Sequence, residues 1–112
     1  MNGPRIEPFK ISDWTPWPFE GFVGVSGSVI LDSPDLILAL LRFESHASIP
    51  EHPGRAEAIV ACLEGEGFTS VGGETAAFRA GQRVTWPRDV SHRLWTEDST
   101  MTTLMVERPT PG

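Results

Sequence analysis

Hydrophobic and polar residues alternate along this chain in short runs, which glycine, proline and other turn residues separate. Val, Ile and Phe are frequent in these runs, and such alternation is typical of β-strands. Gly72–Gly73 suits a two-residue hairpin turn, because both residues tolerate the positive φ angles that such turns require. The stretch 64–67 is predicted to be a break between strands. We predict strands at residues 22–31, 36–43, 58–63, 68–71, 74–78, 83–86, 92–96 and 101–107. This spacing predicts an all-β fold, either a small barrel or a two-sheet roll.

The run Leu36–Phe43 is compatible with two structures. Ser33 and Pro34 are residues that favour the start of a helix, and the richness in Leu and Ala also favours a helix. The short length of the run and the turn residues at 32–35 and 48–53 instead favour a fully buried strand. We predict a strand, although the local sequence alone does not decide between the two.

The two ends of the chain differ in composition from the middle. Residues 1–20 combine four prolines with four Trp and Phe rings, including Trp14 and Trp17, and this predicts an extended arm lying over the domain or a partner subunit. Residues 21–108 form the predicted barrel, and residues 109–112 are predicted to be a frayed tail.

Length and charge exclude several classes of protein. A chain of 112 residues is enough for one domain, and its formal charge of −6 without a basic run argues against nucleic acid and anionic membranes as partners. No apolar stretch is long enough to span a membrane, and the N-terminus lacks the apolar core of a signal peptide, so we expect a cytoplasmic protein. The single cysteine, Cys62, excludes an intramolecular disulfide framework and a multi-cysteine zinc site.

Over roughly residues 36–107 the chain resembles the cupin family. The segment Pro50–Gly67 looks like the first cupin motif, which has His-x-His, three or four residues, Glu, six residues and Gly. The segment Gly81–His92, with Pro87 inside it, looks like the second motif. The resemblance implies a cupin-type antiparallel β-barrel, also described as a double-stranded β-helix or jelly roll. Extended arms are common in small cupins, so it also implies a homodimer with Trp14 and Trp17 packed on the partner.

The resemblance also implies a metal site, because cupins commonly hold a divalent metal ion between three His and one Glu. His52 and His92 match the first and last of the His positions, whereas Gly54 and Ala58 stand where the second His and the Glu would be. Two of the four ligands are therefore absent. If a metal ion is bound, we expect Fe, Mn, Ni, Cu or Zn held with an incomplete ligand set. No organic cofactor is inferred.

Two neighbouring residues are candidates to complete a metal site. Glu57 is adjacent to the vacant Glu position, but consecutive residues of a strand point to opposite faces, so Glu57 should face away from the interior unless a bulge intervenes. His46 precedes the first motif and could reach the mouth of the barrel.

Alternation from Ala58 predicts which residues line the interior. The predicted pocket-lining residues are Ala58, Val60, Cys62, Val84, Trp86 and Leu94. A largely apolar cavity with one or two imidazoles suits a small apolar or aromatic ligand.

Three functions fit these residues, and they leave open whether the protein is an enzyme. The leading hypothesis is a small-molecule site centred on His52 and His92, which act either as a partial metal site or as a metal-free acid and base for an isomerase, cyclase or lyase. The second is a non-catalytic module that binds or senses a metabolite. The third is a dioxygenase-like metal site completed by Glu57 or His46.

Overall fold

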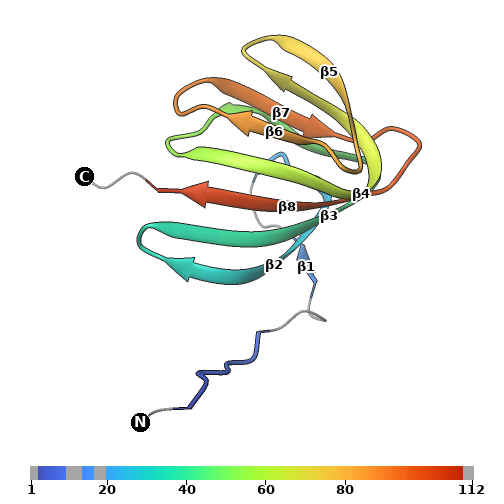
Figure 1. Ribbon diagram of the computed structural model, residues 1–112. Helices are drawn as coiled ribbons and strands as arrows, with labels where there is room; N and C mark the ends of the chain where they lie inside the picture. Colours follow the sequence, from blue (N-terminus) through green and yellow to red (C-terminus); the bar gives the residue numbers. More distant parts are fainter. Residues whose placement is uncertain (1–2, 10–13, 17–19, 110–112) are drawn as a thin grey trace.

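The structure, a computed structural model, describes residues 3–9, 14–16 and 20–109 (Figure 1). All regular elements among these residues are strands, joined in one antiparallel sheet that closes into a barrel. The strands are β1 (Thr15–Pro16), β2 (Val23–Ser33), β3 (Leu36–Pro53), β4 (Glu57–Val71), β5 (Glu74–Arg79), β6 (Arg83–Trp86), β7 (Ser91–Trp95) and β8 (Met101–Arg108). The predicted all-β, jelly-roll architecture is thereby confirmed.

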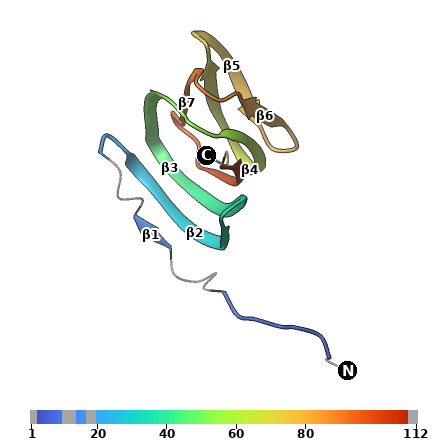
Figure 2. The same cartoon turned by 90° about the vertical axis from the view of Figure 1, so that its left-hand side faces the viewer.

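Two long strands, β3 and β4, frame the barrel (Figures 1 and 2). The first half of β3 pairs with β8 and its second half pairs with β7. β4 likewise pairs with β8 along its first half and with β7 along its second half. Each long strand therefore pairs with both β7 and β8, and the ring β3–β8–β4–β7 is closed. Closure leaves these four strands without a free edge in the middle of the barrel.

The long strands correct two of the predicted breaks. β3 runs through residues 48–53, which were predicted to be a turn, and β4 runs through residues 64–67. At each corner the strand bends instead of ending. His46 adopts a φ of 58° and Gly65 a φ of 78°, and register shifts lie close to them, between Ile49 and His52 after His46 and between Cys62 and Glu64 just before Gly65. Such bulges sharpen the bend of a strand and let it cross from one sheet to the next.

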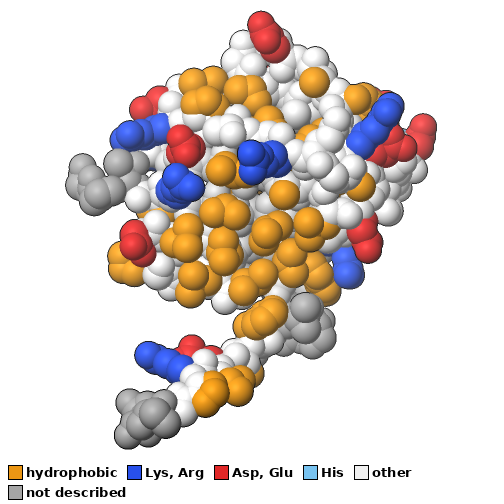
Figure 3. Space-filling model, viewed as in Figure 1, with side chains coloured by type: hydrophobic (Ala, Val, Ile, Leu, Met, Phe, Trp, Pro, Cys, Tyr) orange, Lys and Arg blue, Asp and Glu red, His pale blue; other side chains and the backbone are white. Residues whose placement is uncertain are grey.

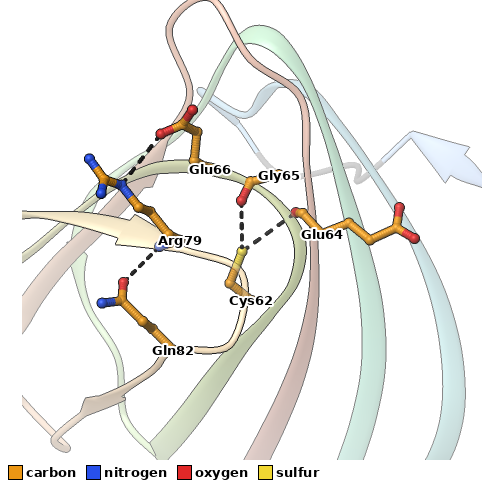
Figure 4. A network of polar contacts seen from close by, with 6 residues as sticks. All are labelled: Cys62, Glu64, Gly65, Glu66, Arg79 and Gln82. Carbon is orange, nitrogen blue, oxygen red and sulfur yellow. Dashed lines mark hydrogen bonds and ion pairs between the residues drawn. The ribbon is translucent and has the colours of Figure 1, made fainter.

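The corner of β4 has its own polar contacts, shown in Figure 4. The Cys62 thiol is directed at the carbonyl oxygens of Glu64 and Gly65, at 3.5 and 3.7 Å. Arg79 contacts the Glu66 carboxylate at 3.5 Å, and its backbone N–H donates to Oε1 of Gln82. Burial raises the pKa of the Cys62 thiol. This cysteine is therefore a buried packing residue rather than a nucleophile.

Two local predictions are confirmed. Leu36–Phe43 is a strand, because its central position between β2 and β8 supplies hydrogen bonds on both edges and buries Leu41 and Phe43 in the core. Tertiary pairing thus overrides the helix preference of Leu and Ala. Gly72 and Gly73 form the tight turn between β4 and β5 with φ angles of 58° and 85°.

The core fills the part of the barrel away from the β3–β4 connection. Its largest fully buried side chains are Phe43, Leu41, Leu94, Met101, Val60 and Thr103. On β3 and β8 the buried residues alternate with half-buried ones, so the intervening side chains point outward.

The N-terminal arm leaves the body of the protein. Residues 3–9 project away from the barrel, with Ile6 and Phe9 exposed (Figures 1 and 2). Trp14 lies over the guanidinium of Arg42 of the same chain, 4.2 Å from the ring centre, and Thr15–Pro16 pairs with β2. Trp17 and residues 110–112 lie outside the described residues. In the described part of the chain, no helix is long and apolar enough to cross a membrane.

Candidate functional site

A cavity of about 440 Å³ opens at the end of the barrel where β3 connects to β4. Its volume is that of a site for a small organic molecule. Most of its lining is apolar, and its polar side chains are two histidines and two glutamates. The lining residues are Glu20, Phe22, Leu41, Ile49, Pro50, His52, Gly54, Ala56, Ala58, Trp86, His92, Met105 and Glu107.

His52 and His92 form the polar centre of this cavity. They are direct partners in the pairing of β3 with β7, and their rings meet edge to face with centroids 4.6 Å apart. His92 is buried, with 4% of its surface exposed, whereas His52 is half-buried and lies 6.2 Å from the ring of Phe22. The two segments that resemble the cupin motifs therefore place His52 and His92 in contact.

Backbone carbonyls fix the tautomer of both imidazoles. Nδ1 of His52 lies 2.8 Å from the carbonyl oxygen of Pro50, and Nδ1 of His92 lies 3.2 Å from that of Val90. Because a carbonyl oxygen only accepts hydrogen bonds, each Nδ1 carries the proton when the ring is neutral. The lone pair on each Nε2 then remains for a ligand in the cavity.

His92 is held in place by a stack and a hydrogen-bond chain. Its ring lies parallel to the indole of Trp86, with centroids 4.0 Å apart. The indole N–H of Trp86 donates to the hydroxyl of Thr69 at 3.3 Å, and that hydroxyl donates to the carbonyl oxygen of Arg93 at 2.9 Å. β4, β6 and β7 therefore jointly orient one imidazole.

Burial favours the neutral form of His92. Desolvation lowers the pKa of His92 below its ordinary value of 6.5, the nearby His52 lowers it further, and the hydrogen bond to the Val90 carbonyl acts in the opposite direction. At neutral pH the His92 imidazole is therefore a neutral base in an apolar surrounding.

Gly54 makes room for His92. A Cβ atom added at Gly54 would lie 2.9 Å from Cε1 of His92, closer than such contacts occur. The backbone here is also tied to the β6–β7 turn, since the N–H of Asp89 donates to the Gly54 carbonyl oxygen at 2.7 Å. Gly54, which stands where the cupin motif has its second histidine, therefore leaves the space that the His92 ring occupies.

The structure places the predicted lining residues at two depths. Ala58 and Trp86 line the cavity, as expected. Val60, Cys62 and Leu94 are instead packed in the core, and Val84 packs against it, so these four correct the predicted lining. Alternation identified inward-facing residues correctly, but the deeper half of the barrel is filled by its own side chains.

The two candidate extra ligands lie away from the cavity. His46 is exposed at the opposite corner of β3, 3.9 Å from the Asp98 carboxylate. Glu57 is exposed and lies 4.0 Å from the guanidinium of Arg108. Neither lines the cavity, and the structure does not bring them to His52 and His92.

The cavity has few groups that could bind a metal ion. Among the described residues, no three His, Cys, Asp or Glu side chains gather closely enough to share a metal ion. The two imidazoles fall short of the roughly three or four protein ligands of strong sites, and Ala58 offers no donor. The described residues therefore do not fit a tightly held divalent metal.

Sequence reasoning missed most of the lining, including its carboxylates. Met105 and Glu107 continue the inward alternation that begins at Met101 of β8, so the pattern of that strand was sufficient to find them. Glu20 and Phe22 come from the segment that leads into β2, where no periodic signal marks them.

The closed barrel and its internal cavity define an all-β protein with a small-molecule-sized site. The sequence profile of the cupin domain family matches residues 39–107, more than half of the chain. The chain therefore belongs to the cupin domain family.

Solved structures of other cupins share the fold at low sequence identity. The polyketide cyclase RemF from Streptomyces resistomycificus matches with a TM-score of 0.84 and 17% identity, over 96% of this chain and 81% of that chain. A predicted oxalate decarboxylase from Thermotoga maritima matches with a TM-score of 0.79 and 19% identity, over 93% and 100%. KdgF from a Halomonas species matches with a TM-score of 0.75 and 18% identity, over 88% and 89%. No curated protein matches the chain.

Proposed function

We propose that the protein is a small cupin that binds a ring-containing, largely apolar molecule in its barrel and acts on it by metal-independent acid–base chemistry. The observation that carries this proposal is the contact between the imidazoles of His52 and His92 inside an apolar cavity, with both Nδ1 atoms engaged by backbone carbonyls. Metal-independent isomerisation, cyclisation or elimination needs no more than such a pair and a shaped pocket.

The two histidines have different roles in this proposal. Buried and neutral, His92 accepts a proton from the bound molecule at Nε2. His52 is half-buried beside it, and once it has taken up a proton from solvent at Nε2 it donates that proton at the position where charge develops. The apolar walls exclude water, which strengthens both interactions. The similarity in fold to a polyketide cyclase supports ring-forming chemistry as one reaction type that such a barrel accommodates.

A generic carbon acid tests the base directly. Nitrobenzisoxazole is a neutral aromatic molecule: a base removes its C–H proton, the N–O bond breaks, and a coloured cyano-nitrophenolate forms. We expect the wild type to accelerate this reaction and His92→Ala to lower the rate by about a hundredfold. His46→Ala, which removes an exposed histidine, is the matched control. Equal rates for the wild type and the His52→Ala/His92→Ala variant would contradict the acid–base proposal.

A non-catalytic binding module is the second candidate. The observation that favours it is that Gly54 and Ala58 leave the cavity with two of the four residues of the cupin metal site. Binding of naphthol by the wild type, without any catalysis of benzisoxazole opening, would support this candidate over the first.

We also propose that the protein is a cytoplasmic homodimer and that its outer sheet face forms the interface. Pairing of β2, β3, β8 and β4 places a band of uncharged side chains side by side on the outside of the barrel. The band consists of Leu31, Leu38, Leu40, Ile59, Ala61, Leu104 and Val106. Figure 3 shows hydrophobic side chains gathered over this part of the molecule.

Charges border the band in a way that suits a second copy. Arg42 and Glu64 lie at one border, next to Thr102, and Arg108 and Glu57 lie at the other. Each border carries one positive and one negative side chain. In a dimer with two-fold symmetry, a positive side chain of one copy can therefore lie opposite a negative side chain of the other. Outside this band, the net charge of −6 makes two copies of the chain repel each other. The uncharged band is therefore the face that suits contact between two copies.

A further inference from the structure

The cavity contains two glutamates, and its described lining includes no side chain with a permanent positive charge. Glu20 and Glu107 belong to its lining, and the described lining residues include neither lysine nor arginine. Glu107 is half-buried and belongs to the inward-facing positions of β8, in line with Met105. A carboxylate in a partly buried, apolar cavity repels a second anion more strongly than it would in water.

The two kinds of polar group lie on different walls. His52 and His92 come from paired positions of β3 and β7, whereas Glu107 comes from β8, where it is paired with Ile37 and Ala58. Apolar side chains, among them Trp86 and Met105, make up most of the remaining lining. A ligand that reaches both walls therefore meets imidazole nitrogens on one side and a hydrogen-bond-accepting carboxylate on the other.

We infer that the cavity selects uncharged aromatic molecules carrying an O–H or N–H donor, and that Glu107 is the residue that rejects carboxylate-bearing ligands. This inference rests on the proposed function, because it concerns the ligand of the same site. Glu107 accepts the donor of the bound molecule, and its negative charge, with that of Glu20 at the cavity, disfavours an acid of the same shape. Aromatic and aliphatic walls supply the remaining contact area.

The positive charge that an acidic ligand needs is missing from this site. Carboxylates and phosphates are usually held by the guanidinium of Arg or the ammonium of Lys, whose charge is permanent near neutral pH. The described lining offers only imidazoles for this purpose. The site is accordingly unsuited to oxalate, although a predicted oxalate decarboxylase shares the fold.

Three probes of nearly equal size test the inference: naphthol, naphthalene and naphthoate, measured at neutral pH by calorimetry or ligand fluorescence. We expect naphthol to bind most tightly, naphthalene more weakly, and naphthoate about tenfold or more weaker than naphthol. Glu107→Gln should weaken the binding of naphthol and strengthen the binding of naphthoate, so the difference between their affinities narrows several-fold. Glu74→Gln is the matched control, because it removes the same charge from the exposed β4–β5 hairpin.

The outcomes separate this inference from the proposed function. If none of the probes binds, the small-molecule cavity itself is refuted. If naphthol and naphthoate bind equally, or if Glu74→Gln changes selectivity as much as Glu107→Gln does, the inference is wrong while the site stands. Should Glu107→Gln fold poorly, Glu20→Gln provides the second test, and it should also strengthen naphthoate binding selectively.

Discussion

The imidazole of His92 lies flat against the indole of Trp86, with ring planes 11° apart and centroids separated by 4.0 Å. Both residues are buried and both line the cavity, so Trp86 shields one face of His92 from water and fixes its orientation. The hydrogen bond from Trp86 to Thr69 holds the indole in turn. The candidate base is therefore supported by residues of β6 and β4, outside its own strand.

Removal of the indole should change both stability and the titration of His92. Trp86→Ala deletes a fully buried side chain, and we expect the free energy of unfolding to fall by about 3–5 kcal/mol. If the variant remains folded, water reaches His92 and its pKa rises toward 6.5, which NMR titration of the imidazole protons measures. A Trp86→Ala variant in which the pKa of His92 stays lowered would show that the indole does not shield it.

The pKa of His92 predicts the pH dependence of stability. Its folded-state pKa is lowered, so the unfolded state binds more protons in the window between the lowered value and 6.5. The contribution of His92 to the free energy of unfolding is therefore complete above pH 6.5. The free energy of unfolding falls as the pH falls through this window, and below the folded-state pKa the titration of His92 causes no further change. Urea unfolding should show this loss in the wild type and in His46→Ala, and a reduced loss in His92→Gln. The same slope in all three proteins would contradict the assignment.

Gly54 should be intolerant of any side chain because of its contact with His92. Gly54→Ala introduces a Cβ atom 2.9 Å from Cε1 of His92, and we expect a loss of about 1–3 kcal/mol in stability and displacement of the imidazole. In Gly54→Ala/His92→Ala the contact no longer exists, so most of the added cost should vanish. A double-mutant cycle from denaturant unfolding measures this coupling. Additive effects of the two substitutions would contradict a direct clash.

The sequence was sufficient to predict the barrel, because the short alternating strands and the spacing of the cupin motifs are retained in this chain. It also singled out His52 and His92, which the structure places as partners of β3 and β7. It was not sufficient to predict how β3 and β4 bend. His46 and Gly65 turn the chain with positive φ angles while the strands continue, and locally such residues look like the ends of strands. The sequence also did not show how deep the cavity reaches. Val60 and Ala58 both face inward, and only the packing of the whole barrel decides that Ala58 lines the cavity while Val60 lies in the core.

Metal content distinguishes acid–base chemistry from a retained metal site. The described residues supply two imidazoles without a third donor, so protein purified without added metal should contain well under one equivalent of iron, manganese, nickel, copper or zinc. Elemental analysis of the wild type and of His92→Ala makes the measurement. A full equivalent of one metal in the wild type that is lost in His92→Ala would contradict the metal-independent proposal.

The outer band of β2, β3, β8 and β4 predicts the oligomeric state. Leu104 lies in the middle of this band, beside Leu40 and Ala61, so a charge at this position would be buried without a partner in the proposed homodimer. We expect light scattering after size exclusion to give twice the mass of the 12.3 kDa chain for the wild type and one chain mass for Leu104→Glu. Val23→Glu, which adds the same charge at an exposed position of β2 outside the band, should remain dimeric. A monomeric wild type at concentrations in the micromolar range would refute the interface, and a dimeric Leu104→Glu would place the contact on another face.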